Sequence, residues 1–463
     1  MLFSSIPFLY YFFPAVCLLY FISPRKLKNT VLLVSSLIFY GWGEPKYLFL
    51  MITTILVFYL CGLAIGSAVS QKMKKLWLTL SCVVGLGLLG VFKYADFFVD
   101  SFNAVTGLSV PMLRLALPIG ISFYTFQSLS YTIDVYRGNV AVQKNPITFG
   151  AYVALFPQLI AGPIVRYVDV AAELNERTHS LEDAALGLRR FFVGLAKKIL
   201  LANQFGQFCS IFRGSDEKSL VFYWLYGAAF MLQIYFDFSG YSDMAIGLGR
   251  IFGFHFIENF NYPYLSRSIT EFWRRWHMSL GTWFRDYVYI PLGGNRVKKS
   301  RWVFNILAVW MLTGLWHGAS WNFVLWGLMF ALLLLLEKAV KIERLPAALS
   351  HLYVLFLVMF SFVLFNAQDL TQAGQDFLGL LGLSGAPLVS PETLYYLRSY
   401  GLLFLCGIAG STPVVRDGFR YLSREKCPRV MAVLEPVLMA LALLICTAYL
   451  VDGSFNPFLY FRF

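Results

Sequence analysis

The chain has 463 residues, of which 58% are hydrophobic and only 14% carry a charge. Soluble domains contain about a quarter charged residues, so this composition excludes an ordinary soluble globular protein. The net charge of +13 comes from short basic clusters between apolar segments, so we expect no nucleic-acid partner. The seven cysteines are scattered without a CxxC pair, and they indicate neither a disulfide framework nor a zinc site.

Hydrophobic segments recur along the whole chain, which predicts one all-α, polytopic membrane domain over residues 1–463. A spanning helix needs about 20 apolar residues, so we expect about eleven transmembrane helices, with the shorter segments tilted, paired or re-entrant. The segments lie at residues 6–23, 30–43, 47–70, 76–92, 115–133, 146–165, 219–236, 241–256, 302–317, 321–337, 350–366, 396–411 and 431–451.

Basic residues predict the orientation of the spans, because loops rich in Lys and Arg face the cytoplasm. Arg25, Lys26 and Lys28 follow the first segment, which places the N-terminus outside the cytoplasm. The strongest cytoplasmic marker is the basic segment 266–301, with eight Lys or Arg residues against two acidic ones. Counting onward from it, the last span runs outward, so the C-terminal tail 455–463 is also expected outside the cytoplasm.

Two segments depart from simple spans. Residues 156–163 are apolar but contain two prolines and a glycine, and proline lacks the N–H that an uninterrupted helix needs. Broken backbone is tolerated at membrane depth where it is buried in protein or lines a cavity, so a re-entrant turn is expected here. Residues 181–201 mix apolar side chains with arginines and lysines, which predicts an amphipathic helix on the cytoplasmic surface.

His317 ends the apolar segment 302–317. Sixteen residues separate it from Arg301, and at 1.5 Å per residue they reach about 24 Å into a hydrocarbon core of about 30 Å. A neutral imidazole there can take a proton from a hydroxyl that attacks an activated acyl group, so His317 is our first candidate catalytic base. Gly314 and Gly318 would let a substrate approach it. A histidine hydrogen-bonded within a helix bundle is the structural alternative.

A second histidine, His277, follows Trp273 by four residues. This spacing places both side chains on one face of a helix that continues through Leu280 and Phe284. Because His277 follows the start of the basic segment, we expect it near the cytoplasmic rim, and His317 deeper. His277 is therefore a weaker candidate catalytic residue than His317.

Arginines and tryptophans near the two histidines are candidate substrate-binding residues. Arg274, Arg275 and Arg285 can anchor an anionic donor, such as the phosphates of a cofactor. Trp273 and Trp316 are the aromatic candidates. An interfacial helix with snorkelling arginines and a tryptophan belt explains the same residues without any substrate.

Two other patterns indicate a structural role more than a catalytic or binding role. Asp237 and Asp243 interrupt an apolar run, but a spacing of six with no histidine nearby is poor evidence for a metal, and we expect helix capping and packing. No metal site is predicted. Residues 85–90 match GxGxxG inside an apolar segment with no strand before them, which favours helix packing over nucleotide binding.

The sequence also contains stretches specific to one family. These are Phe272-Trp273-Arg274-Arg275-Trp276-His277-Met278-Ser279-Leu280 and Leu315-Trp316-His317-Gly318. They closely resemble the membrane-bound O-acyltransferase (MBOAT) family, and the second matches the signature whose histidine is catalytic. Residues 117–124, 131–137 and 156–163 look like the bacterial alginate O-acetyltransferase branch. The resemblance covers nearly the whole chain.

The resemblance implies a fold and an activity. Helices would surround a central funnel or tunnel across a bacterial cell (inner) membrane and its lipid, with His317 at the narrow part. A thioester donor such as acetyl-CoA would enter from the cytoplasm, and no cofactor would be bound permanently. Alternatives within this chemistry are acetyl transfer to peptidoglycan or cellulose and D-alanyl transfer to teichoic acid.

The tail residues Phe458-Leu459-Tyr460-Phe461-Arg462-Phe463 resemble an acyl-transfer motif of envelope-acylating systems, whose tyrosine accepts the acyl group. The resemblance makes Tyr460 a candidate catalytic residue. It also implies an extracytoplasmic partner, similar to SGNH-type acetyltransferases, that passes the acetyl group to a polysaccharide such as alginate. An aromatic interfacial anchor is the structural alternative for the tail.

A transporter or flippase with a gating histidine is the alternative from a different class of protein. Transporter folds usually show internal repeats with paired broken helices. The pattern in residues 271–318 has no second copy in the chain.

Overall fold

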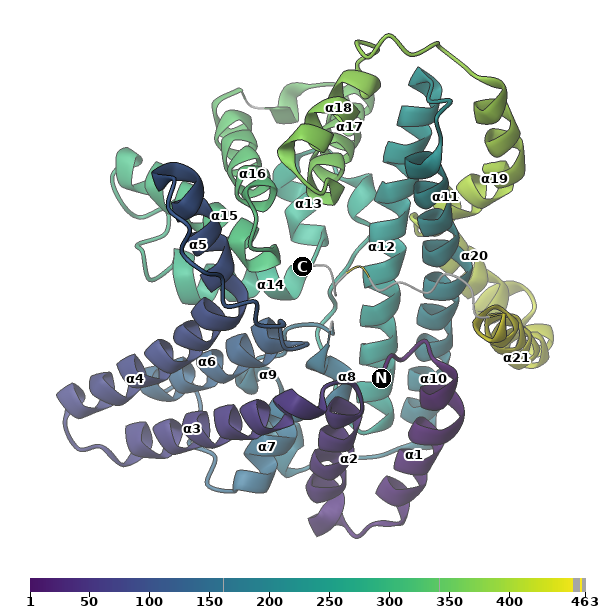
Figure 1. The fold of residues 1–463 in the computed structure, drawn as a ribbon. Coiled ribbons are helices and arrows are strands. Elements are labelled where there is room, and N and C mark those ends of the chain that lie inside the picture. Colours follow the sequence, from purple (N-terminus) through teal and green to yellow (C-terminus); the bar gives the residue numbers. More distant parts are fainter. Residues whose placement is uncertain (161, 341, 453–458, 460–463) are drawn as a thin grey trace. The chain divides into compact units, whose positions relative to one another are not determined.

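A computed structural model describes residues 1–160, 162–340, 342–452 and 459. Helices are the only regular secondary structure in these ranges, which confirms the all-α fold class (Figure 1). The chain divides into two compact units: unit 1 is Met1–Phe191 with Met244–Ile257, and unit 2 is Phe192–Asp243 with Glu258–Phe463. A division by internal contacts does not decide how many domains a membrane protein has, so one domain over residues 1–463 stays a prediction.

In unit 1, helices pack both on their sequence neighbours and on helices further along the chain. The long helices α3 and α4 contact each other and α6, and α2 contacts α7. The helices are α1 (Phe13–Ile22), α2 (Lys28–Gly43), α3 (Leu48–Ser67), α4 (Gln71–Leu89), α5 (Ala95–Thr106), α6 (Ile121–Arg137), α7 (Pro146–Ala154), α8 (Phe156–Leu159), α9 (Tyr167–Asn175) and α10 (Leu181–Ala196).

The apolar segment 146–165 is interrupted, as its prolines predict. α7 ends at Ala154 and α8 begins at Phe156, with Pro157 in its first turn. The break is buried in protein, and the Phe156 N–H donates to Ser36 Oγ at 3.0 Å. The freed backbone group is thereby satisfied, which is the condition for broken helices at membrane depth.

Unit 2 contains the segments that carry both histidines. Here α15 packs on α16, α16 on α17, and α13 on α16. The helices are α11 (Asn203–Gly214), α12 (Leu220–Ile251), α13 (Ile269–Arg275), α14 (Met278–Phe284), α15 (Lys299–His317), α16 (Trp321–Val340), α17 (Ala347–Asn366), α18 (Leu370–Leu380), α19 (Pro391–Gly410), α20 (Val414–Tyr421) and α21 (Pro428–Val451). The last residues of α12 belong to unit 1.

α12 is one continuous helix of 32 residues, where the sequence predicts two apolar segments separated by capping aspartates. Asp237 and Asp243 both lie in the interior of this helix, so the capping prediction is wrong. Their charges are neutralised by lysines: Lys198 Nζ lies 2.6 Å from Asp237 Oδ1, and Lys197 Nζ lies 2.6 Å from Asp243 Oδ2. These lysines stand about 40 residues earlier in the chain, a pairing that local sequence patterns do not reveal.

Six helices of the described chain are long and apolar enough to cross a membrane, or seven if the bent pair Pro391–Gly410 and Val414–Lys426 counts as one span. The multi-pass character is therefore confirmed, but the number eleven is not. Several apolar segments form helices shorter than a span needs, such as α2 with 16 residues and α6 with 17.

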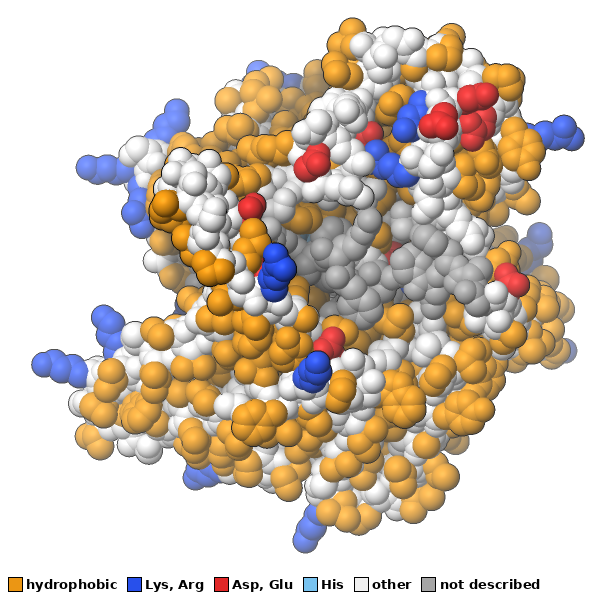
Figure 2. Space-filling model, viewed as in Figure 1, with side chains coloured by type: hydrophobic (Ala, Val, Ile, Leu, Met, Phe, Trp, Pro, Cys, Tyr) orange, Lys and Arg blue, Asp and Glu red, His pale blue; other side chains and the backbone are white. Residues whose placement is uncertain are grey.

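Apolar side chains cover much of the exposed surface. On the face drawn in Figure 2, hydrophobic residues predominate and charged ones are few. On α3 and α4, for example, Leu60 and Val83 are 59% and 63% exposed. Extensive exposed apolar surface marks contact with a membrane or another protein, and its presence on helices of spanning length favours lipid.

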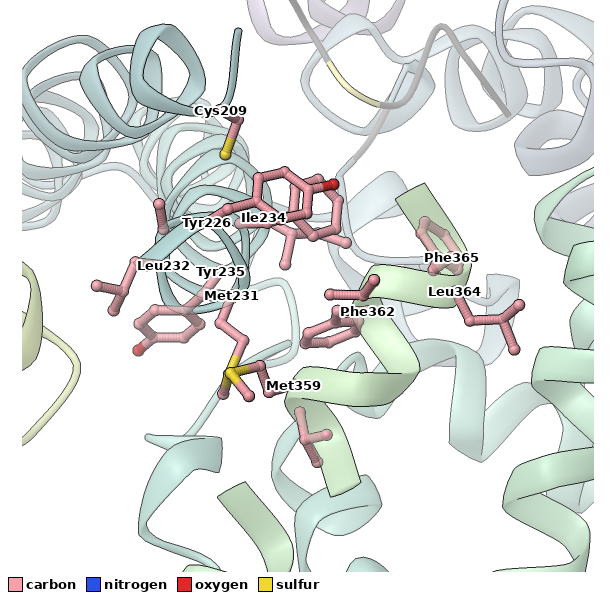
Figure 3. Close-up of a cluster of buried hydrophobic side chains, with 14 of the residues drawn as sticks. Cys209, Tyr226, Met231, Leu232, Ile234, Tyr235, Met359, Phe362, Leu364 and Phe365 are labelled. Carbon is pink, nitrogen blue, oxygen red and sulfur yellow. The ribbon is translucent and has the colours of Figure 1, made fainter. Parts of the chain in front are cut away.

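The core of unit 2 is rich in aromatic side chains. Figure 3 shows Tyr226, Ile234 and Tyr235 of α12 in one buried cluster with Phe362 and Phe365 of α17. α12 and α17 approach closely at Gly227, where a Cβ atom would lie 2.9 Å from the sulfur of Met359. Both helices also contribute side chains to the pocket of His317.

Candidate active site

His317 is placed by the close packing of α15 against α16. Gly314 and Gly327 face each other across this pair, and a Cβ atom on either would overlap a backbone carbonyl of the opposite helix. A Cβ atom on Gly318 would overlap the ring of Phe323. Small residues that let helix backbones approach are typical of membrane helix pairs. Gly314 and Gly318 therefore serve packing, and the expectation that they leave room for substrate is wrong.

The His317 imidazole is 7% exposed and surrounded by aromatic rings. Its centroid lies 5.0 Å from the Trp316 ring, 5.1 Å from Trp326 and 5.4 Å from Phe365. The side chain faces a pocket that otherwise has mainly apolar walls, which are formed by Ile234, Asp237, Phe238, Trp276, Trp326, Phe362, Phe365 and Leu459. A mainly apolar pocket with a few placed polar groups is the usual form of a small-molecule site.

The helix expected through both Trp273 and His277 is interrupted. α13 ends at Arg275, and His277 has a φ of +46°, in the left-handed region that non-glycine residues seldom adopt. Backbone hydrogen bonds with an upstream segment stop the helix: the Asn261 N–H donates to the Arg275 carbonyl, and the Met278 N–H donates to the Asn259 carbonyl. Trp273 and His277 therefore do not share a helical face.

Asn259 fixes the proton on the His277 ring. Its Oδ1 accepts from the backbone N–H of Ser279 at 3.2 Å and from Ser279 Oγ at 2.9 Å. A backbone N–H cannot accept a hydrogen bond, so this atom of the amide must be the oxygen. His277 Nδ1 lies 3.1 Å from the same oxygen and therefore donates to it. The ring consequently carries its proton on Nδ1, and Nε2 is its acceptor nitrogen.

Both histidines lie against Trp316, and their different depths in the membrane stay a prediction of the charge pattern. The His277 ring centroid is 5.8 Å from that of Trp316 and 4.6 Å from that of Phe238. Burial lowers the pKa of His277 well below its usual range, and the nearby His317 lowers it further. Both effects keep His277 neutral at physiological pH. The break after α13 is what turns His277 inward, toward His317.

The three predicted arginines differ in what they contact. Arg275 binds the Glu271 carboxylate at 2.9 Å, and Arg285 binds Asp286 at 2.7 Å. Arg274 has an exposed side chain on α13. Arg275 and Arg285 each already face a carboxylate, so Arg274 is the strongest of the three candidates for binding an anionic donor.

The two predicted tryptophans lie on different sides of the histidines. Trp316 is buried between the His277 and His317 rings. Trp273 packs on Trp310, Trp326 and Phe330, with centroids between 4.7 and 5.6 Å apart. Trp326 in turn contacts His317, so Trp273 supports the pocket wall from behind.

Tyr460 lies outside the described residues. Leu459, the residue before it in the chain, is described: it lines the pocket of His317, and its backbone N–H donates to Asp237 Oδ2 at 3.0 Å. No metal site is predicted, and among the described residues no three His, Cys, Asp or Glu side chains form a group that could hold a metal ion.

Sequence reasoning missed the polar residues that hold the site together. Asn259 fixes His277, Asp237 pairs with Lys198 and contacts Leu459, and Glu337 of α16 binds the first turn of α13. The Glu337 carboxylate accepts from the Ile269 N–H and, at 3.0 Å, from the Thr270 N–H. Each of these residues acts on a segment far away in sequence. Single buried charges within apolar runs were the one available signal.

Comparisons with known proteins show the family of the chain. The profile of MBOAT, the membrane-bound O-acyltransferase family, matches residues 37–366. A probable alginate O-acetylase AlgI of Azotobacter vinelandii is 40% identical over the full length of both chains. A peptidoglycan O-acetyltransferase of Helicobacter pylori is 35% identical over 86% of this chain and 83% of its own.

A more distant relative is a teichoic acid D-alanyltransferase of Bacillus subtilis, 31% identical over 47% of this chain and 58% of its own. The family profile spans both histidines and the helices that hold them, and its members are acyltransferases rather than transporters. The chain therefore belongs to the membrane-bound O-acyltransferase family and is a multi-pass membrane acyltransferase.

Proposed function

We propose that the chain moves an acetyl group from cytoplasmic acetyl-CoA across the membrane, for O-acetylation of an extracytoplasmic polysaccharide such as alginate. The acceptor is inferred from the alginate O-acetylases that resemble the chain over their full length. In this proposal both termini lie outside the cytoplasm of a bacterial inner membrane. Segments 181–201 and 266–301 lie on the cytoplasmic side, where the donor enters.

The proposed reaction is acyl transfer to a hydroxyl, with His317 as general base. His317 takes the proton of the Tyr460 phenol while the phenolic oxygen bonds to the carbonyl carbon of the thioester. The C–S bond then breaks, and the sulfur leaves as coenzyme A after the imidazolium returns the proton. An unassisted phenol with a pKa near 10 is mostly protonated at neutral pH, so the step needs a base.

The remaining residues have supporting roles in this proposal. Arg274, Arg275 and Arg285 attract the phosphates of the donor. His277 presents Nε2 as an acceptor within the same site and so assists in proton transfer. An extracytoplasmic partner of the SGNH acetyltransferase type takes the acetyl group from Tyr460 to the polysaccharide.

One observation carries the proposal: His317 is buried at a mainly apolar pocket that also contains Leu459, the neighbour of Tyr460 in sequence. A base in a pocket that excludes water can act on a substrate hydroxyl without competition from hydrolysis. A histidine that served packing alone would need no such pocket.

A His317→Ala variant tests the base assignment. General-base catalysis contributes roughly 100- to 10,000-fold, so we expect polymer acetylation to fall by at least 100-fold. The measurement is the acetyl content of the secreted polysaccharide from cells that carry only the variant. His351→Ala is the matched control, because His351 lies in α17 outside the pocket and should keep full acetylation. Full acetylation by a normally inserted His317→Ala variant would refute the assignment.

A Tyr460→Phe variant tests whether the tail accepts the acyl group. The substitution keeps the aromatic ring but removes the hydroxyl, so an interfacial anchor would survive it and an acyl acceptor would not. We expect polymer acetylation to be abolished while the protein remains in the membrane at its normal level. Acetylation at the level of the unmodified chain would leave the tail as an anchor only.

The acceptor polymer is tested by analysing what is acylated. Mass spectrometry of polymers from expressing cells distinguishes acetylated alginate, cellulose and peptidoglycan from D-alanylated teichoic acid. We expect acetylated alginate. The finding of D-alanyl esters on teichoic acid would refute both acetyl-CoA as the donor and alginate as the acceptor.

A further inference from the structure

Asp237 is a buried carboxylate at the wall of the His317 pocket that the proposed reaction does not use. It lies in the middle of α12, and its side chain is 3% exposed. The sequence suggests helix capping and packing for this residue. Three observations give it a more specific role.

First, Asp237 forms an ion pair with Lys198. The two side chains are 2.6 Å apart and both are nearly fully buried. Removing two charges from water costs several kcal/mol per ion, and an apolar pair of similar size is often at least as stable. Stability alone therefore does not account for an ion pair at this position.

Second, the two carboxylate oxygens have different partners. Oδ1 faces Lys198, whereas Oδ2 accepts the backbone N–H of Leu459 at 3.0 Å. A charged acceptor makes a hydrogen bond roughly twice as strong as a neutral one. This contact joins α12 to a residue more than 200 positions later in the chain.

Third, the Leu459 side chain is buried in the same pocket as His317, with 6% of it exposed. Ile234 and Phe362 line the pocket with it, on α12 and α17 respectively. Leu459 is thus held twice, by its backbone through Asp237 and by its side chain through apolar contacts. A backbone held in this way has a defined register along the pocket.

We propose that Asp237, together with Lys198, is a positioning residue that seats the C-terminal chain at Leu459 and so presents Tyr460 to His317. This inference rests on the proposed function, in which Tyr460 accepts the acetyl group. Asp237 does not itself touch the reacting atoms. Its carboxylate sets where Leu459 lies in the pocket, and small errors in such positioning are costly for catalysis.

A second ion pair on the same helix provides a matched control. Lys197 and Asp243 are also 2.6 Å apart, but their side chains are 24% and 15% exposed, and Asp243 does not line the pocket. Exchanging the charges of either pair keeps an ion pair in place. Only the exchange at Asp237 removes the acceptor of the Leu459 N–H.

The first experiment measures the seating of Leu459 without acyl transfer. In the full chain, Leu459→Cys keeps the backbone N–H and adds a thiol, while six native cysteines are replaced by alanine. Cys209, which is 7% exposed in unit 2, is retained as an internal reference for folding. Maleimide labelling of the two thiols is followed by mass spectrometry of their peptides.

We expect the combined Lys198→Asp and Asp237→Lys exchange to accelerate labelling at position 459 by about tenfold or more, since a hydrogen bond to a charged group is worth roughly 10- to 100-fold in an equilibrium constant. The combined Lys197→Asp and Asp243→Lys exchange should leave the rate unchanged, and Cys209 should stay slow in both. Equal labelling at position 459 in the two exchanges would overturn the inference.

The second experiment removes the donor and leaves the Lys198–Asp237 pair intact. Leu459→Pro eliminates the N–H, whereas Leu459→Ala keeps it. We expect polymer acetylation to fall at least tenfold further in the proline variant than in the alanine variant. Equal losses would mean that the side chain alone seats the tail and would refute the role of Asp237.

Different results would refute Tyr460 as the acyl acceptor and Asp237 as the anchor of Leu459. If Tyr460→Phe keeps full acetylation while the Asp237 exchange exposes position 459, Tyr460 is not the acceptor, and Asp237 anchors a tail with another role. If Tyr460→Phe abolishes acetylation while the Asp237 exchange leaves position 459 protected, the acceptor assignment stands and the anchor is refuted.

Discussion

Asn259 makes the most informative contact of any single residue in the site, because its amide oxygen determines which nitrogen of His277 carries the proton. His277 and Ser279 both depend on it, and its Nδ2 donates to Ser242 Oγ at 3.0 Å. Asn259 is 1% exposed. Removal of the amide would leave both the imidazole and the Ser279 N–H without this acceptor.

We therefore expect Asn259→Leu to lower the rate of acetyl transfer by about tenfold or more, since a lost hydrogen bond to a buried group costs about 1–3 kcal/mol. Asn259→Asp keeps the acceptor and should retain more activity, with a pH profile displaced upward because a carboxylate favours the charged imidazole. The measurement is the rate of acetyl transfer from acetyl-CoA between pH 5 and 9. Equal rates and profiles for all three proteins would contradict the role assigned to Asn259.

Only some residues of the site could be predicted from the sequence. His277 and His317 stand out in the sequence because imidazoles are rare in apolar segments. Asn259, Lys198 and Asp237 do not stand out, because their partners lie 17 to 222 positions away in the chain. Local patterns can mark an unusual residue, but they do not show which distant residue satisfies it.

At the scale of elements, the site depends on two short helices, α13 and α14, that longer helices hold in place. Helices of seven residues are too short to be stable alone. Glu337 helps to stabilise α13, because its carboxylate accepts hydrogen bonds from the N–H groups of Ile269 and Thr270 at the start of that helix. A carboxylate at a helix N-terminus also interacts favourably with the helix dipole.

Glu337→Leu should destabilise unit 2 by about 1–2 kcal/mol, as expected for the loss of a helix cap, and should reduce activity with it. Thermal unfolding of the purified protein in detergent measures the first effect. Glu425→Leu is the control, because Glu425 is exposed and its replacement should change stability by less than about 0.5 kcal/mol. A Glu337→Leu variant as stable as the control would show that α13 does not depend on this cap.

The elements themselves were partly predictable. Hydropathy located α16, α17 and α21 closely, because each is a long apolar helix between polar ends. Hydropathy divided α12 into two segments, because two aspartates within an apolar run indicate the end of a helix. The lysines that pair with Asp237 and Asp243, and so allow the helix to continue, are far away in the sequence. The continuous helix through Trp273 and His277 was wrong for a similar reason: the hydrogen bonds that stop α13 come from Asn259 and Asn261.

At the scale of the whole molecule, an acyltransferase fold follows from the family, and the described geometry adds a pocket in which His317, Asp237 and Leu459 meet. The composition excludes a soluble enzyme, and the apolar surface of the spanning helices is consistent with lipid around them. The central claim is that His317, acting as general base, promotes transfer of the acetyl group from the thioester to Tyr460 of the same chain.

That claim is tested most directly by intact-protein and peptide mass spectrometry after the purified chain is incubated with acetyl-CoA in the absence of any partner. We predict one acetyl group on the C-terminal peptide, at Tyr460, that is absent from the His317→Ala and Tyr460→Phe variants and present in His351→Ala. Acetylation of the C-terminal peptide to the same extent in His317→Ala, or none in the unmodified chain while it still supports polymer acetylation in cells, would contradict it.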